Sequence, residues 1–421
     1  VRALLDELVT FRVLDPACGC GNFLYVSYRE LRGLEHELKQ RYERFCAEHG
    51  EPAASNLPYY PLSNIKGIDI EQVAVMVARV TLWMGHRQMV ERYGPAEPVL
   101  PLTDLSGVRA ADALQADWPE VDAIVGNPPF LGSQLLRASM GDGYLRWLTS
   151  TFGVGIKDLC VYWFRKAHDH LKPGQRAGLV GTNSISQNTA RDASLDYIVE
   201  KGGVITDAVS SQRWPGDAKV HVSLVNWVKQ PPASVEHYVL DGDEVTGITS
   251  SLRKGGAEDW KPRPLTPNQD RCFIGSSLHG GGFRLSADEV EQFDVRSSPV
   301  VKRFLDGKDI VTRIDQSPSR WVIDFGTMGL EHAAKFEKEL ALVRTRVKPE
   351  RDLNRRPLYK QRWWLHGETR PGMRTATRDL PRTAVSTRTG KRLLLTWQAP
   401  DTLPSDANVV FAFDDDYSMG I

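Results

Sequence analysis

The chain has 421 residues, which exceeds what one compact core usually holds and predicts two domains. Hydrophobic residues make up 41% of the sequence and charged residues 25%, and no run approaches the roughly 20 apolar residues that cross a bilayer. These values exclude a membrane protein and a disordered one. The formal net charge is zero, so only a local concentration of charge could indicate a polyanionic partner.

The chain starts at Val1 with a helical pattern and has neither a starting Met nor a signal peptide, so we expect a fragment of a longer protein. Its five cysteines are an odd number at scattered spacings, which is typical of reduced thiols in a cytoplasmic protein. Cys18 and Cys20 are too isolated to form a zinc site, and the sequence predicts no metal.

Short β-like runs alternate with longer helical runs over the first two hundred or so residues. This alternation predicts an α/β fold with a doubly wound sheet and helices on both faces. We expect strands at 11–14, 64–70, 121–126 and 177–181, an antiparallel strand at 220–228, and helices at 22–48, 71–89 and 158–171. In the second of these helices we expect the buried side to carry Val73, Val77, Val80, Leu82 and Met84.

Residues 261–267 are rich in proline and predict a linker, so we place domains at 1–262 and 263–421. The second domain has weakly periodic elements, and residues 409–413 predict a strand close to its end. Its segment 344–392 holds about 15 Lys and Arg but only about four Asp and Glu, interleaved with Tyr359, Trp363 and Trp364. Such a segment is either a solvated basic face or a nucleic-acid interface.

A Gly-rich turn joins the first expected strand to the first long helix, in the sequence Asp15-Pro16-Ala17-Cys18-Gly19-Cys20-Gly21-Asn22. Glycine lets the backbone approach a ligand closely, and the free amides of a helix N-terminus suit a ligand carboxylate. Asp15, at the end of the strand, could accept a hydrogen bond from a ligand ammonium group. The alternative is a tight strand-to-helix turn without a ligand.

Two further acidic residues are candidates for the ligand site. Asp69 ends the second expected strand, where an ionised carboxylate can accept both hydroxyl groups of a ribose. The alternative for Asp69 is a cap for the helix that follows. Asp112 lies in a third loop, where it could meet the amino group of an adenine ring, although an Asp in a loop has many structural uses.

The buried strand at 121–126 runs into Asn127-Pro128-Pro129-Phe130. The two prolines donate no backbone hydrogen bond and stiffen the loop, so Asn127 is presented in a fixed pose. The Asn127 side-chain oxygen and the Pro128 carbonyl can then accept both hydrogens of an exocyclic amino group, while Phe130 stacks on the base. The alternative is a proline-rich turn with Phe130 in the core.

In this order the motifs resemble those of amino-group DNA methyltransferases of the gamma arrangement, in particular MmeI-like restriction-modification enzymes. The resemblance covers about residues 1–230. It implies S-adenosylmethionine (SAM) as cofactor and Asn127, Pro128, Pro129 and Phe130 as the catalytic loop. It also implies a SAM site lined by Asp15, Pro16, Cys18, Gly19, Gly21, Asn22, Asp69, Ile70, Asp112 and Ala113.

As partners the resemblance implies double-stranded DNA with a flipped target adenine, together with an upstream nuclease domain or other restriction or defence subunits. The second domain is then a smaller mixed α+β target-recognition domain. The chain departs from the family in Cys20, which stands where many relatives have Ser, and in lacking a recognisable SAM-binding helix before residue 11. No nuclease signature is found either.

Other methyltransferase chemistries must also be weighed. Enzymes that methylate carbon 5 of cytosine need a thiolate on a Pro-Cys loop, and this sequence has no Pro-Cys pair. Cytosine amino-group enzymes usually carry Ser in place of Asn127, whereas protein and RNA methyltransferases share the Asn-Pro-Pro-aromatic loop. A non-catalytic DNA-recognition subunit is the alternative of a different class. The basic second domain favours DNA as the substrate.

Overall fold

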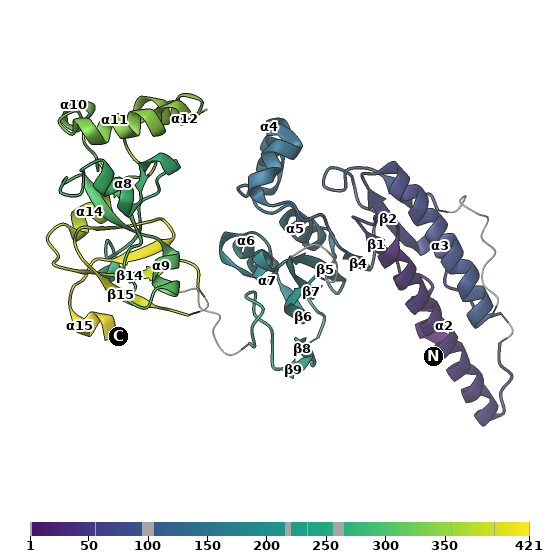
Figure 1. The fold of residues 1–421 in the computed structure, drawn as a ribbon. Helices are drawn as coiled ribbons and strands as arrows, with labels where there is room; N and C mark the ends of the chain where they lie inside the picture. The colour runs from purple at the N-terminus through teal and green to yellow at the C-terminus, as the bar shows by residue number, and fades with distance from the viewer. Residues whose placement is uncertain are drawn as a thin grey trace. The chain divides into compact units, whose positions relative to one another are not determined.

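The computed structural model describes residues 2–54, 56–94, 105–214, 220–233, 235–255, 265–354, 356–390 and 392–420. The chain divides into two compact units, Val1–Trp260 and Lys261–Ile421, which we call unit 1 and unit 2 and describe separately (Figure 1). The expected domain boundary at 262 and 263 and the start of the expected linker lie outside the described residues.

Unit 1 contains a nine-stranded sheet in the order β3-β2-β1-β4-β5-β7-β6-β8-β9. Its first five strands in the chain are parallel, and β7 is antiparallel to both of its neighbours. The order reverses between β1 and β4, which confirms the doubly wound α/β fold. The strands are β1 Val13–Asp15, β2 Ile65–Asp69, β3 Val108–Ala110, β4 Ala123–Gly126, β5 Arg176–Thr182, β6 Gly203–Arg213, β7 His221–Lys229, β8 Tyr238–Leu240 and β9 Asp243–Val245.

Helices cover both faces of this sheet, because successive side chains of a strand point to opposite faces. Val13, Ile65 and Val108 pack in one core cluster with residues of α2 and α3. Leu14, Ile68 and Ile124 pack in another with residues of α5. The helices of unit 1 are α1 Arg2–Leu8, α2 Asn22–His49, α3 Gln72–Tyr93, α4 Ser133–Phe152, α5 Cys160–His170, α6 Asn188–Ala193 and α7 Leu195–Glu200, with 3-10 turns at Leu62–Asn64 and Asn183–Ser186.

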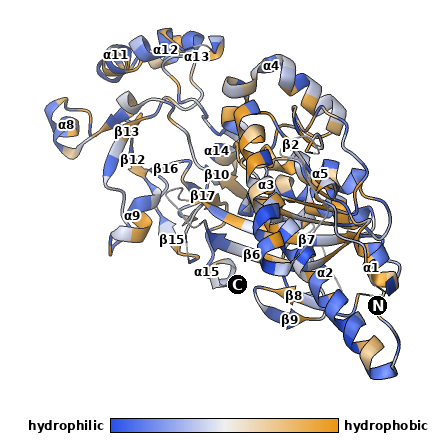
Figure 2. Cartoon of the chain, turned by 90° about the vertical axis from the view of Figure 1, so that its right-hand side faces the viewer, coloured by the Kyte–Doolittle hydropathy of each residue, from blue (hydrophilic) through white to orange (hydrophobic). Residues whose placement is uncertain are grey.

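The expected strands and helices of unit 1 are confirmed, whereas the sequence did not predict β3, α4, α6, α7, β6, β8 and β9. The antiparallel strand expected at 220–228 is β7, which lies between β5 and β6. Strands β8 and β9, which follow β7 in the chain, extend the same sheet. The second half of α2 projects beyond the sheet and is mainly hydrophilic (Figure 2).

The prediction for the buried side of α3 is wrong except at Leu82. Val73, Val77, Val80 and Met84 are 42 to 71% exposed, and the buried positions include Ala78 and Gly85. Helix α3 carries apolar residues on both faces, so periodicity alone does not identify the inner one. The close approach of α2 determines which face of α3 is buried. A Cβ on Gly21 would lie 2.9 Å from the Ala78 Cα, and a Cβ on Gly85 would lie 2.6 Å from the Tyr25 ring.

Unit 2 is a mixed α+β domain, as the sequence analysis expects. It has two four-stranded sheets, β10-β17-β14-β15 and β11-β13-β12-β16, and helices α10 to α12 lie together at one end of the unit (Figure 1). The strands are β10 Cys272–Ile274, β11 Arg284–Leu285, β12 Val301–Leu305, β13 Arg320–Ile323, β14 Thr383–Thr387, β15 Leu395–Gln398, β16 Thr402–Pro404 and β17 Asn408–Phe411. The helices are α8 Ala287–Gln292, α9 Gly307–Thr312, α10 Leu330–Ala333, α11 Glu337–Arg346, α12 Lys348–Asp352, α13 Pro357–Gln361, α14 Pro371–Thr377 and α15 Asp416–Gly420, with 3-10 turns at Thr266–Asn268 and Gly281–Phe283.

The aromatic residues of the basic segment are not arranged as a stacking face. Trp363 belongs to the hydrophobic core of unit 2, and Tyr359 is also buried. Trp364 is half-buried and donates from its indole nitrogen to the Met328 carbonyl at 3.0 Å. Aromatic residues between arginines therefore stabilise the fold here. Over the described residues, no helix has both the length and the apolar content that spanning a membrane requires.

Candidate cofactor and catalytic site

Strands β3, β2, β1 and β4 are neighbours in the sheet, so the residues that follow their carboxyl ends meet at one edge. Asp112, Asp69, Asp15 and Asn127 stand at these four strand ends. A pocket of about 340 Å³ lies there. Seven of its lining residues were predicted from the sequence: Pro16, Asp69, Ile70, Asp112, Ala113, Asn127 and Pro129. Five others were not: Ala17, Met140, Tyr144, Leu159 and Trp163.

The Gly-rich turn after β1 supports the pocket more than it lines it. The Gly19 amide donates to Asp69 Oδ2 at 2.8 Å, which joins the turn to the end of β2. Gly21 has a left-handed backbone with φ of 89° and lies against Ala78 of α3. Cys18 is buried in the core, and burial raises the pKa of its thiol. Cys18, Gly21 and the exposed Asn22 therefore shape the start of α2, and the pocket itself is lined by Pro16 and Ala17.

Asp15 is a buried carboxylate with one unused oxygen. Its Oδ1 accepts the Ala17 amide at 3.0 Å, whereas its Oδ2 is buried and has no hydrogen-bond partner in the described parts of the chain. A Cβ on Gly126 would lie 2.6 Å from Asp15 Oδ1, so β4 needs a glycine beside this carboxylate. Burial raises the pKa of Asp15 to about 7, and the nearby charge of Asp69 adds to this effect. An acceptor is thus held ready for a donor that the described chain does not provide.

Asp69 holds the backbone at the start of α3 and also lines the pocket. Its Oδ1 accepts the Glu71 amide at 2.9 Å at the start of α3, and its Oδ2 accepts the Gly19 amide. Each carboxylate oxygen can accept a second hydrogen bond. Asp69 therefore fixes two backbone segments and can still accept hydroxyl groups from the pocket that it lines.

Asp112 is also fixed by several donors. Its Oδ1 accepts the Leu114 amide at 2.9 Å, and its Oδ2 accepts the Gln115 side chain at 2.8 Å and the Tyr144 hydroxyl at 2.9 Å. Burial raises the pKa of Tyr144, and the Asp112 carboxylate raises it further. Tyr144 comes from α4, whose backbone breaks from helical geometry at Gly141. Helix α4 thereby provides a wall of the pocket that no sequence motif indicated.

Lys166 of α5 holds the turn that follows Asp112. Its ammonium group donates to the carbonyls of Ala113, Leu114 and Ala116 at 2.8, 2.9 and 2.6 Å. The Trp118 indole also donates to the Ala113 carbonyl, at 2.8 Å. The sequence does not predict that Lys166 holds this turn, because the turn and α5 meet only in the folded unit.

The Asn-Pro-Pro-Phe loop begins where β4 ends. Asn127 Oδ1 is buried and has no hydrogen-bond partner among the described residues. Pro128 is buried, Pro129 lines the pocket and Phe130 is half-buried against the core. The rings of Phe130 and Trp214 pack edge to face, with their centroids 6.3 Å apart. Trp214, directly after β6, was not identified from the sequence because it lies outside the motifs.

Comparisons with known proteins agree with this geometry. The family model described as the DNA-methyltransferase domain of MmeI matches residues 1–236. DNA methyltransferase A of Bacillus subtilis (strain 168) is 28% identical over 236 residues, which cover 53% of this chain and 26% of that protein. A putative type II restriction enzyme and methyltransferase of Methanocaldococcus jannaschii is 34% identical over 116 residues, covering 27% of this chain and 9% of that protein.

The fold is similar to a solved structure of the type IIL restriction-modification enzyme MmeI in complex with DNA. The match covers 99% of this chain and 59% of that chain, with a TM-score of 0.78 and 21% identity. The chain thus spans at most 26% of the two curated relatives and 59% of this structure. A likeness at this identity shows a shared fold.

Proposed function

Because the chain belongs to the MmeI DNA-methyltransferase family, we propose that it transfers a methyl group from SAM to the exocyclic amino group of adenine in double-stranded DNA. Unit 1 is the catalytic domain and unit 2 the target-recognition domain of this proposal. The activity belongs to a restriction-modification or phage-defence system, with an upstream nuclease domain or other subunits as partners.

The residues at the sheet edge fit SAM in three respects. The free Oδ2 of Asp15 suits the ammonium of the methionyl part, and Asp69 can accept ribose hydroxyls. Asp112 can accept a hydrogen bond from the adenine amino group, and Ile70 and Pro129 add apolar side chains to the lining of the same pocket. When bound, SAM supplies an electrophilic methyl group on a positively charged sulfur.

The observation that carries the proposal is the unpaired, buried Oδ1 of Asn127. A buried polar atom without a partner is costly, so its retention beside the pocket favours a functional acceptor. This oxygen accepts a hydrogen from the target amino group, which draws the nitrogen lone pair out of conjugation with the base. The nitrogen can then attack a methyl group presented from the pocket.

An adenine within a duplex cannot reach Asn127, so the base must leave the stack. Phe130 and Trp214 offer two aromatic surfaces beside the catalytic loop, and Trp214 is an additional residue in this proposal. An extruded base stacks on one of these rings while its amino group meets Asn127. Stacking positions the base, and Asn127 activates its nitrogen.

The test is the variant Asn127→Ala in the full chain, with Asn268→Ala in an exposed turn of unit 2 as the matched control. We expect Asn127→Ala to lower methyl transfer to DNA by at least about 100-fold, because a polarising contact in the transition state is lost. SAM affinity, measured by calorimetry, should change little. Turnover above about a tenth of wild type would refute the role of Asn127.

Nucleoside analysis of the methylated DNA tests the choice of base. We expect N6-methyladenine as the product of the wild-type chain. N4-methylcytosine alone would keep the amino-group mechanism and reject adenine, whereas SAM binding without any methyl transfer would favour a non-catalytic recognition subunit.

A further inference from the structure

Unit 2 has a cavity of about 270 Å³ within the basic segment, separate from the pocket of unit 1. Three arginines line it, Arg351, Arg362 and Arg370, and Glu368 is the one carboxylate among its described lining residues. Thr327 and Thr369 add hydroxyl groups. The lining is therefore positively charged and rich in hydrogen-bond donors.

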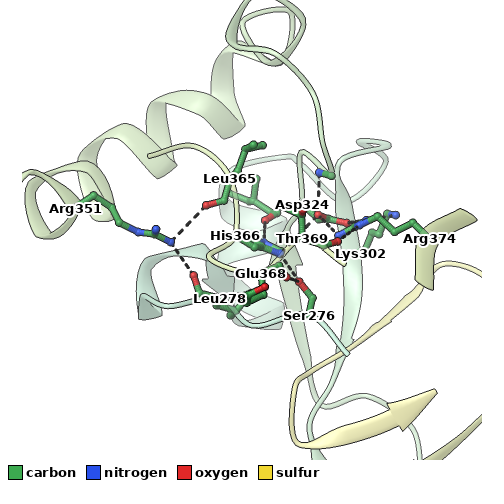
Figure 3. A network of polar contacts seen from close by, with 12 residues as sticks. Ser276, Leu278, Lys302, Asp324, Arg351, Leu365, His366, Glu368, Thr369 and Arg374 are labelled. Carbon is green, nitrogen blue, oxygen red and sulfur yellow. Dashed lines mark hydrogen bonds and ion pairs between the residues drawn. The ribbon is translucent and has the colours of Figure 1, made fainter. Parts of the chain in front are cut away.

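Arg351 of α12 is the unusual member of this group, because it is only 1% exposed. Its Nη2 donates to the carbonyls of Leu278 and Leu365 at 2.8 and 3.4 Å (Figure 3). Its Nε and Nη1 are buried and have no hydrogen-bond partner among the described residues. The guanidinium lies 4.7 Å from the centre of the Tyr359 ring, which offers a partial negative face but no full counter-charge.

Two other shielded arginines of this chain, Arg32 and Arg374, are paired with carboxylates. Arg32, the other arginine buried to this degree among the described residues, forms an ion pair with Glu35. Arg374 binds Asp324 through two nitrogens at 2.7 and 2.9 Å (Figure 3). Arg351 forms no ion pair within the described residues, and a buried charge without a partner is strongly disfavoured. An anion in the adjacent cavity would compensate this charge.

The rim of the cavity provides groups that could contact such an anion directly. Arg362 is exposed, and its side chain forms no hydrogen bond or ion pair with the described parts of the chain. Arg370 donates from Nε to the Gly275 carbonyl at 3.2 Å, and its Nη1 lies 3.7 Å from Glu368. Its backbone is left-handed, with φ of 52°, a conformation that costs free energy in a residue other than glycine and is often found at functional sites.

We propose that this cavity binds a phosphate group of the DNA backbone, with Arg362 and Arg370 in direct contact and Arg351 acting from its base. Guanidinium groups match the oxygen atoms of a phosphodiester in geometry and charge. Arg351 lines the cavity and is 1% exposed, so water screens its charge only weakly. The inference rests on the proposed function, because it takes duplex DNA as the partner of unit 2.

The experiment measures the affinity of the full chain for two duplexes of unrelated sequence over a range of salt concentrations. Arg362→Gln and Arg370→Gln are compared with wild type and with Arg296→Gln, a control whose exposed guanidinium is paired with Glu291. Arg362→Gln is the decisive variant, since Arg362 has no described partner whose loss could unfold the unit. If Arg351→Met is folded, its affinity for the same duplexes tests the contribution of the buried arginine.

We expect both rim variants to weaken binding about five- to tenfold on both duplexes, and to lower the slope of log affinity against log salt by about one. Arg296→Gln should have a clearly smaller effect. Unchanged affinity of Arg362→Gln would overturn the inference. A loss confined to one duplex would also overturn it, because it would indicate base reading in place of phosphate binding.

Three further outcomes identify the source of the phosphate and show whether the inference or the proposed function fails. If inorganic phosphate raises the melting temperature of wild type but not of Arg362→Gln, while DNA affinity is equal in both, the cavity is a free-phosphate site and the DNA assignment is overturned. If the rim variants bind DNA like wild type and methyl transfer is intact, the inference fails alone. If they weaken DNA binding but wild type transfers no methyl group, the proposed function fails and the phosphate site is supported.

Discussion

The buried carboxyl group of Asp15 makes the stability of unit 1 depend on pH, and Asp15→Asn removes this dependence. Burial raises the pKa of Asp15 from 3.8 to about 7, a difference of about 3. One pKa unit corresponds to about 1.4 kcal/mol, so ionising Asp15 in the folded state costs about 4 kcal/mol. The side chain is 1% exposed, so little of this cost is relieved by solvent.

The sign follows from the raised pKa of the folded state. The folded chain holds the Asp15 proton more tightly than the unfolded chain. Protonated Asp15 therefore contributes fully to the free energy of unfolding below about pH 4, and this contribution is lost as pH rises from about 4 to 7. An amide does not titrate. From pH 5 to pH 8, Asp15→Asn should therefore gain about 2 to 3 kcal/mol in free energy of unfolding relative to wild type.

Guanidinium unfolding of the full chain at several pH values between 5 and 8 measures this difference. Asp6→Asn in α1 is the control, because Asp6 is exposed, and its profile should run parallel to that of wild type. Parallel profiles for Asp15→Asn and wild type would refute the reasoning.

The same carboxyl group should make SAM binding depend on pH. The ionised form is the acceptor for the ligand ammonium, so wild-type affinity should fall as pH drops below about 7. Asp15→Asn should bind more weakly at pH 8 and show a nearly flat profile. Calorimetric titrations test this, and a flat wild-type profile would remove Asp15 from contact with the ligand.

Three more substitutions test the site and the core. Asp69→Ala should weaken SAM binding by about 1.5 to 3 kcal/mol in calorimetry, because a charged hydrogen-bond partner is lost, with DNA affinity little changed. Lys166→Met should raise KM for SAM more than it lowers kcat, because the turn after Asp112 loses three hydrogen bonds. Lys166→Arg should recover part of the effect, and an unchanged KM would argue against a positioning role for Lys166. Trp227→Ala should lower the free energy of unfolding by about 3 to 5 kcal/mol in guanidinium titrations. The Trp227 side chain is 1% exposed, and its ring stacks on Phe164 with the ring centroids 5.6 Å apart. A loss below about 1 kcal/mol would show that the surrounding core relaxes to fill the space.

The sequence by itself determined the doubly wound sheet and much of the pocket. Asp69 ends an expected strand and Asn127 directly follows one, and parallel strands bring their carboxyl ends to one edge whatever the details of packing. The two glycines after Asp15 likewise predicted a turn that only small residues allow. These features depend on local backbone geometry, which a short stretch of sequence encodes.

The tertiary structure decided which surfaces meet. Helix α3 has apolar side chains on both faces, and its inner face is set by the approach of α2 to Ala78 and Gly85. Tyr144, Lys166 and Trp214 reach the site from elements distant in sequence. The sequence of a basic segment equally does not show which arginines form ion pairs. Arg351 stands out because folding buries it without an ion pair among the described residues. Such roles depend on contacts between distant segments, and these contacts exist only once the chain has folded.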